Sequence, residues 1–97
     1  MDDIAKYFKV FSDPVRLEVI QLINRCESCS CNMVDKLPIT QPTLSYHLKH
    51  ISKAGLATTK REGNWIKYHL DITKVDQMID FLTNLKKEHG ENKGCKL

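Results

Sequence analysis

The chain has 97 residues, of which 41% are hydrophobic, and it carries four cysteines and a formal net charge of +3. That length suffices for one compact domain with a single modest core, so we expect no second domain. No apolar run is long enough to span a bilayer and the first residues do not resemble a secretory signal, which favours a cytoplasmic protein without membrane contact.

The hydrophobic pattern predicts about five helices. They are expected over residues 2–11, 12–24, 31–37, 41–54 and 74–89. Asp13 and Thr40 are candidates to cap the second and fourth of these helices, and Gly55 is placed to end the fourth. We therefore expect a folded domain over residues 1–89 and a flexible tail over residues 90–97.

Two strand-like runs lie between the last two helices. They cover residues 56–61 and 65–70, and Glu62-Gly63-Asn64 between them is a strong signal for a hairpin turn. The same region carries most of the positive charge. From Thr40 to Leu70 there are five lysine and arginine residues and one glutamate, a net +4, which leaves −1 for the remainder. Such a basic segment is typical of nucleic-acid binders, although a solvated lysine face would give the same count.

A short helix, a tight turn containing Pro38 and a second helix match a helix-turn-helix, and the charged hairpin behind them is its wing. The predicted fold class is therefore mainly α with a β-hairpin, a winged helix-turn-helix of about five helices and a two-stranded wing. Apolar residues of the second helix form a stripe of Leu44, Leu48 and Ile51, and its polar residues are expected on the other side.

The polar side chains predicted to contact duplex DNA come from that helix and from the wing. They are Thr40, Gln41, Thr43, Ser45, Tyr46, His47 and Lys49, followed by Lys60, Arg61, Asn64 and Lys67. We expect Gln41, Ser45 and His47 to discriminate between base sequences. The positive side chains of the wing are expected to contribute affinity through phosphates.

Two segments, "FSDPVRLEVIQLI" and "ITQPTLSYHLKHISKAGLATTKREGNWIKYHL", resemble the ArsR/SmtB family of metal-responsive bacterial repressors. The resemblance covers roughly residues 4–85, and Tyr46 departs from it because relatives often have histidine there. It implies a homodimer that binds a palindromic operator in double-stranded DNA and leaves it when an inducer binds. Terminal helices usually form the dimer interface in this family. Their apolar residues here are Ile4, Phe8, Val75, Met78 and Leu82.

Three of the four cysteines, Cys26, Cys29 and Cys31, lie within six residues of one another. Disulfides are uncommon in the cytoplasm, and residues as close as Cys29 and Cys31 are poorly placed to join distant parts of a fold, so metal ligands or reactive thiols are favoured. Clustered sulfur suits soft ions rather than magnesium or calcium.

The motif "ESCSCNMV" resembles the Cys-x-Cys of family members that sense soft ions, with Cys29 and Cys31 in the matching positions. The "TQPTLSYHL" helix resembles the arsenic-responsive branch, which implies arsenite or antimonite as the inducer. Where one arrangement in that branch has its third cysteine, this chain has Val34. A third sulfur would then come from Cys26 or, less simply, from Cys95 in the tail. The alternative is that two sulfurs suffice, with solvent or an exogenous thiol as the further ligand.

Other functions remain open at this stage. The cysteines could sense oxidation or persulfides, or they could bind cadmium, lead or zinc on the same fold. A thiol-dependent arsenate reductase would need a Cys-x5-Arg loop, which this sequence lacks, so we predict no enzyme and no catalytic residues or cofactor. An inert DNA-architectural protein with bystander cysteines is the remaining alternative.

Overall fold

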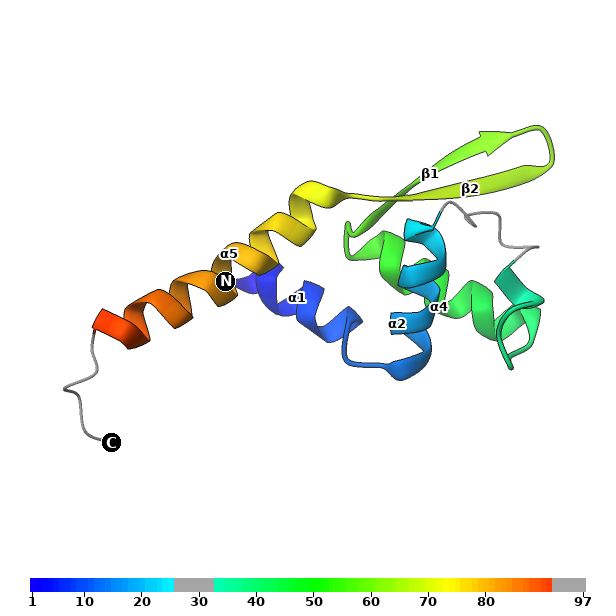
Figure 1. Ribbon diagram of the computed structural model, residues 1–97. Coiled ribbons are helices and arrows are strands. Elements are labelled where there is room, and N and C mark those ends of the chain that lie inside the picture. Colours follow the sequence, from blue (N-terminus) through cyan, green and yellow to red (C-terminus); the bar gives the residue numbers. More distant parts are fainter. Residues whose placement is uncertain (26–32, 92–97) are drawn as a thin grey trace.

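The computed structural model describes residues 1–25 and 33–91 (Figure 1). Its elements are α1 (Asp2–Val10), α2 (Pro14–Asn24), α4 (Gln41–Lys53), β1 (Ala57–Glu62), β2 (Trp65–Leu70) and α5 (Ile72–Glu91). The helix predicted over 31–37 begins outside the described residues, and Met33 and Val34 are helical. The fold class is the predicted one, a mainly helical chain with a hairpin wing. The described residues contain four α-helices with the bounds given above, whereas about five were predicted.

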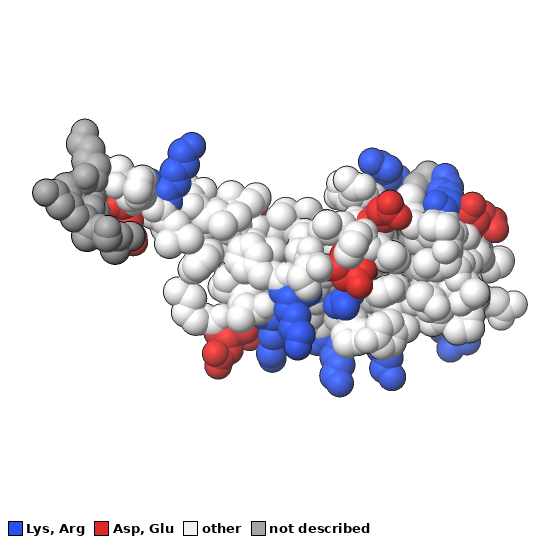
Figure 2. All heavy atoms as spheres, turned by 90° about the horizontal axis from the view of Figure 1, so that it is seen from below, with Lys and Arg blue, Asp and Glu red and all other residues white. Residues whose placement is uncertain are grey.

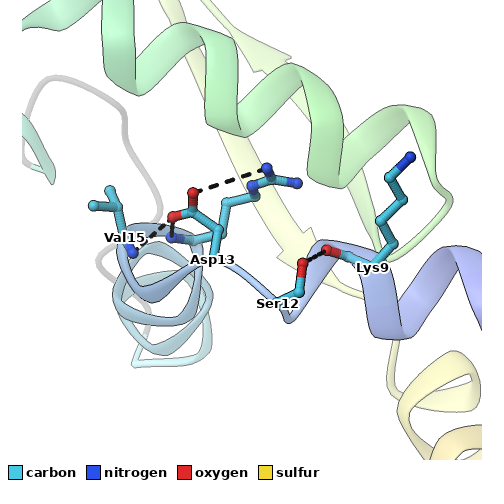
Figure 3. Close-up of polar contacts among 5 residues, drawn as sticks. Lys9, Ser12, Asp13 and Val15 are labelled. Carbon is cyan, nitrogen blue, oxygen red and sulfur yellow. Dashed lines mark hydrogen bonds and ion pairs between the residues drawn. The ribbon is translucent and has the colours of Figure 1, made fainter.

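The start of α2 is fixed by a cap that the sequence predicted (Figure 3). The Asp13 carboxylate accepts hydrogen bonds from the backbone N–H groups of Val15 at 2.8 Å and Arg16 at 3.1 Å. The guanidinium of Arg16 lies 3.9 Å from the same carboxylate. The pKa of Asp13 is lowered, chiefly because the Arg16 N–H donates to the ionised form. In the turn before it, the Ser12 hydroxyl donates to the Lys9 carbonyl.

Both ends of α4 also carry the predicted signals. Thr40 Oγ1 accepts a hydrogen bond from the Thr43 backbone N–H at 3.4 Å, which satisfies a donor that the first turn leaves free. At the other end, Gly55 follows the last turn with φ of +89°, a left-handed conformation that favours glycine. Local chemistry therefore sets where this helix begins and ends.

The core lies between α2, α4 and the residues that connect them. Its most deeply buried side chains are each at most 1% exposed; they are Val19, Met33, Leu44, Leu48, Ile51 and Leu56. Burying one leucine or isoleucine fully contributes about 1.5–3 kcal/mol to stability. This packing holds α4 against α2, and it thereby fixes which side of α4 faces outward.

The hairpin is anchored at its base and free at its tip. The strands pair antiparallel along their whole length, and Glu62 stands opposite Trp65 beside a two-residue turn. Gly63 in that turn has φ of +61°, as tight hairpin turns require. Tyr68 and Leu70 of β2 pack on the core, whereas the tip projects beyond the helices (Figure 1).

The last helix, α5, runs away from the core with α1 beside it (Figure 1). The ring centroids of Phe8 on α1 and Phe81 on α5 are 5.9 Å apart. α5 begins earlier than the predicted residue 74, because the Asp71 carboxylate accepts from the Thr73 N–H at 3.0 Å and caps it. It also continues through Gly90, so the predicted tail starts inside the helix. Among the described helices, this one included, none is long and apolar enough to cross a membrane.

Candidate DNA-binding surface

The outward side of α4 carries polar side chains. Gln41, Thr43, Ser45, Tyr46 and Lys49 are all exposed there, as the sequence predicted. Amide and hydroxyl groups can hydrogen-bond base edges, and a lysine can neutralise a phosphate. The opposite side of the helix is held in the core, so these groups stand on a fixed surface.

Thr40 is exposed as well, but its hydroxyl is already in use. Besides capping α4, Thr40 Oγ1 donates a hydrogen bond to Thr43 Oγ1 at 3.1 Å. A phosphate that bound either hydroxyl would compete with this pair. The two threonines therefore order the start of α4 before any DNA arrives.

His47 does not lie on the outward side, which corrects the placement predicted from sequence. It is 7% exposed and belongs to the buried side of α4 with Leu44, Leu48 and Ile51. Three residues after Leu44 and four before Ile51, it falls between them on the helix circumference. Its Nδ1 is buried with no hydrogen-bond partner among the described residues. A base edge cannot reach this imidazole while α4 keeps its place in the core.

Two residues that were not among the predicted DNA contacts, His50 and Lys53, complete the outward side of α4. With Tyr46 and Lys49 they line a hollow of about 210 Å³. The rings of Tyr46 and His50 meet edge to face with centroids 4.6 Å apart. His50 and Lys53 follow Tyr46 by four and seven residues, which places all three on one helix face. This spacing is the sequence signal that could have identified the two residues. These side chains add donors for phosphates near the end of α4.

The wing divides its positive charges between two faces. Lys60 and Lys67 stand opposite each other on one face, and Arg61 stands opposite Ile66 on the other. Lys60 and Arg61 are exposed and make no ion pair with another described residue. Asn64 is exposed in the turn. Both faces of the wing can thus contact a polyanion.

Lys67 differs from the other two because it already has a partner. Its Nζ lies 3.0 Å from Glu62 Oε2, and the two side chains are 43% and 46% exposed. The hydrogen bond from Lys67 lowers the pKa of Glu62. An ion pair this exposed is screened by solvent and exchangeable. A phosphate that approaches Lys67 therefore competes with Glu62.

Positive charge also forms a row on the surface of the molecule. Seen from below, Lys and Arg side chains follow the lower edge of the view, with acidic side chains at its left end (Figure 2). A row of this kind attracts a polyanion such as duplex DNA over several ångströms.

All four cysteines lie outside the described residues: Cys26, Cys29 and Cys31 in 26–32, and Cys95 in 92–97. The predicted inducer site stays a prediction. In residues 1–25 and 33–91, no three His, Cys, Asp or Glu side chains are grouped so as to hold a metal ion.

The segment that joins the cysteines to α4 is described, and it is anchored. Met33 is fully buried and Leu37 is 9% exposed, in the same core as Leu44 and Leu48 of α4. A displacement of this segment would therefore disturb the packing beneath α4.

The residues predicted to pair two copies differ in their surroundings. Met78 is 6% exposed and packs in the core of its own chain, so it offers little surface to a partner. Leu82 is 52% exposed, and the remaining three are partly buried: Ile4, Phe8 and Val75. Further apolar side chains of α5 that are about half exposed are Ile72, Ile79 and Leu85. An apolar row is thus left open along α5.

A helix-turn-helix with an outward polar helix and a basic hairpin behind it defines a winged helix-turn-helix protein. Residues 13–59 match the family described as bacterial regulatory protein, arsR family. The chain belongs to the ArsR family of transcriptional regulators, whose winged helices bind operator DNA and which are regulators rather than enzymes.

Known relatives agree with this assignment. An uncharacterized HTH-type transcriptional regulator of Methanocaldococcus jannaschii is 37% identical over 82 residues, which are 84% of this chain and 92% of that protein. An arsenical resistance operon repressor of Staphylococcus xylosus is 33% identical over 94 residues, 96% of this chain and 86% of that protein. The fold is that of a solved ArsR-like transcriptional regulator from Rhodococcus sp. RHA1, with a TM-score of 0.85 at 19% identity, covering 96% of this chain and 88% of that one.

Proposed function

We propose that this chain is a homodimeric repressor that binds a palindromic operator and releases it when arsenite or antimonite binds its clustered cysteines. The observation that carries operator binding is the outward polar side of α4, whose opposite side is fixed in the core. The arsenical resistance operon repressor of S. xylosus supports the choice of inducer. Such a repressor meets its operator in the cytoplasm, where we place it.

In this proposal the two helix-turn-helix surfaces read the major groove. Gln41 and Ser45 hydrogen-bond base edges, with Tyr46 beside them. His47 takes no part because it is buried. Contacts to the sugar–phosphate backbone come from Thr40, Thr43, Lys49, His50 and Lys53 of the helix and from Lys60, Arg61, Asn64 and Lys67 of the wing.

Pairing of two copies is assigned to α1 and α5. The half-exposed side chains of Ile79, Leu82 and Leu85 supply its centre, flanked by Ile4 and Phe8 of α1. A two-fold pairing of identical surfaces relates the two copies of α4 by the same symmetry that relates the two half-sites of a palindrome.

The inducer is assigned to Cys29 and Cys31, with Cys26 as the third sulfur and Cys95 as the other candidate. Soft thiolate ligands suit thiophilic ions. Side chains two apart in a helix point about 200° away from each other, so these two cysteines cannot hold one ion while the turn between them is helical. Ion binding therefore requires a non-helical turn.

That requirement couples the ion to α4. Met33 and Leu37 follow the cysteines and are buried against the core side of α4. Either the turn before Met33 is already non-helical or the ion must unwind it. An ion that stabilises the unwound form would shift this packing and with it the outward side of α4 relative to the groove. Such coupling is reciprocal, so operator DNA weakens arsenite binding by the factor by which arsenite weakens operator binding.

The test uses the full chain and a duplex recovered from a random pool by repeated selection. Fluorescence anisotropy of the labelled duplex should show tight binding that arsenite abolishes under fully reducing conditions. Cys29→Ser/Cys31→Ser should bind the duplex normally and keep it in arsenite. Cys95→Ser is the matched control and should still release, if Cys26 supplies the third sulfur.

The outcomes separate the alternatives. Release only after oxidation or persulfide treatment would assign the cysteines to redox sensing, and release by cadmium, lead or zinc alone would assign them to those ions. Binding that no ion or oxidant changes would leave a DNA-binding protein without an inducer. Arsenite-driven release from the double variant would move the sensor elsewhere in the chain.

A further inference from the structure

The proposed function leaves one hollow of the molecule unused. It measures about 320 Å³ and lies where the end of α2, the strand β2 and the start of α5 meet. The described residues that line it are Ile23 and Asn24 of α2, residues 67–70 of β2 and Ile72 of α5. Small-molecule sites in proteins have volumes from about 300 Å³ upward, so this hollow has room for a compact ligand.

The hollow runs along the open edge of β2. Four consecutive residues of the strand line it, and because consecutive side chains alternate between the two faces, the edge is what all four share. β1 occupies the other edge. Hydrogen-bonded pairs recur there at every second position from the turn to Leu56, whose carbonyl accepts from the Asp71 N–H at 2.8 Å. Tyr68 and Leu70 therefore turn their backbone N–H and C=O groups to the open edge, where no other described backbone group bonds them.

The walls of the hollow combine apolar side chains with hydrogen-bond donors. Ile23 is 4% exposed and Leu70 is partly buried, whereas Ile72 is 53% exposed and takes no part in the proposed pairing of two copies. Lys67 supplies a positive charge, and the Asn24 amide and the ring of His69 supply N–H groups. None of the described residues that line the hollow is acidic. The walls thus suit a molecule that is apolar at one end and anionic at the other.

Two carboxylates lie near the hollow, and both already have partners. Glu62 accepts from Lys67 at 3.0 Å in an exposed pair that solvent screens, so a ligand can exchange with it. The Asp71 carboxylate accepts from the backbone N–H of Thr73 at 3.0 Å and from its hydroxyl, and it caps α5. Neither carboxylate is therefore free to bind a cation in the hollow.

We propose that this hollow binds a small organic anion, a carboxylate on a flat apolar body of the size of benzoate. Four residues of a strand extend over about 10 Å, which such a molecule can span. Its carboxylate accepts hydrogen bonds from the open edge of β2 and from Lys67, and bonds of this kind are strengthened by the charge. Its apolar body lies on Ile23, Leu70 and Ile72. The site is separate from the cysteines predicted to bind the inducer, and its occupancy does not depend on the proposed operator binding.

The test uses nuclear magnetic resonance of the full chain, without DNA and under reducing conditions. Benzoate is the probe. It should shift the methyl signals of Leu70 and Ile72 and the amide signal of Tyr68, and these shifts should saturate together. Acetate keeps the charge but lacks the apolar body, and benzyl alcohol keeps the body but lacks the charge. Each of these two should bind at least about tenfold more weakly than benzoate, because each loses one of the two kinds of contact.

Two isoleucines give a matched pair of variants. Ile72→Ala removes part of the apolar wall and should weaken benzoate binding about fivefold. Ile66→Ala is the control, because Ile66 is 42% exposed on β2 but does not line the hollow. It should leave benzoate binding unchanged. Lys67→Ala should reduce the preference for benzoate over benzyl alcohol. Circular dichroism checks that the three variants are folded.

Several outcomes would overturn the inference, and none of them bears on the proposed function. One is the absence of saturable shifts up to millimolar benzoate. Others are equal binding of benzyl alcohol and equal losses in Ile72→Ala and Ile66→Ala. Shifts confined to Tyr46 and His50 would assign the anion to the hollow on α4 instead. If an extended acidic peptide shifted the signals of β2 and benzoate did not, the open edge would be a site for an added strand. Signals of the hollow that moved with protein concentration alone would assign it to a second copy.

Discussion

α4 and α5 are both amphipathic helices, yet they bury their apolar sides to very different extents. Leu44 and Leu48 of α4 are at most 1% exposed. On α5, Met78 is buried, whereas Leu82 and Leu85 remain 52% and 51% exposed. α4 makes all its apolar contacts within its own chain, whereas α5 makes only some of its apolar contacts there.

In the proposed function the difference separates two tasks. Reading a base sequence requires that α4 be held rigidly, and one chain suffices for that. Matching the spacing of two half-sites would require that two chains be held at a fixed distance, and the open side of α5 is the surface that we assign to this pairing. Substitutions on the two helices should therefore fail in different ways.

The largest effect is expected on the buried side of α4. Leu48→Ala leaves a cavity beneath the helix and should lower the free energy of unfolding by about 2–5 kcal/mol at any protein concentration. Leu82→Ala removes the same atoms from α5 and should cost about 0.5 kcal/mol in dilute protein, and more as pairing increases. Chemical denaturation at two concentrations measures both. If both variants lost the same free energy of unfolding at both concentrations, Leu82 would belong to the same core as Leu48, and the two helices would not differ.

A charge introduced on the open side of α5 should weaken the pairing of two copies. A fully buried leucine contributes about 1.5–3 kcal/mol, so Leu82→Glu should weaken the dimer, and with it operator binding, by an order of magnitude or more. Sedimentation velocity and duplex anisotropy measure the two effects. Thr83→Glu, one residue further on the same helix and also exposed, is the control for added charge. A Leu82→Glu chain of unchanged mass and affinity would contradict the assignment.

On the DNA-facing side, the expected effects are smaller and of two kinds. Gln41→Ala should cost about 1–3 kcal/mol and flatten the preference among duplex variants. Lys60→Ala should weaken all duplexes alike and reduce the slope of log affinity against log salt by about one unit. Lys67→Ala should reduce that slope less, because Lys67 exchanges Glu62 for phosphate. An equal reduction in both lysine variants would show that the ion pair does not persist in solution.

The smallest effect concerns the cap of α2, the helix against which α4 packs. The pKa of Asp13 is lowered in the folded chain, so its ionised form stabilises the fold at neutral pH. That contribution is lost as the pH falls from the ordinary value of about 4 through the lowered pKa. Asp13→Asn keeps the acceptor but does not titrate. The melting temperature of the wild-type chain should exceed that of Asp13→Asn at neutral pH, and the gap should close in acid; a gap that widens there would contradict this.

Features with local causes could be predicted from the sequence. Asp13 and Thr40 cap the helices expected of them, and Gly63 forms the hairpin turn, because each signal depends on residues within one turn of the chain. Features set by distant packing could not. The apolar residues of α4 do not indicate how far the buried side extends around the helix. The structure shows that the buried side includes His47.

The same limit applies to the terminal helices. Met78 and Leu82 lie on one apolar stripe, and the sequence of α5 alone does not indicate which of them the rest of the chain covers. Asp71 caps α5 three residues before the predicted start of the helix, and this cap was not predicted from the sequence. The ligand contacts predicted for the cysteines stay predictions, because those residues lie outside the described part of the chain.

The contact between Phe8 and Phe81 has a consequence for how the protein is made. It closes a loop of about 70 residues, so its entropic cost is met only when both ends of the chain exist. Contacts of α2, α4 and the hairpin join nearer neighbours, and they can form as soon as β2 has left the ribosome. We therefore expect a nascent chain to possess its DNA-reading part before α1 finds its place on α5. If α1 and α5 pair two copies as proposed, a prematurely terminated polypeptide would carry that part without the means to pair, and it could not compete with the finished chain for a palindromic operator.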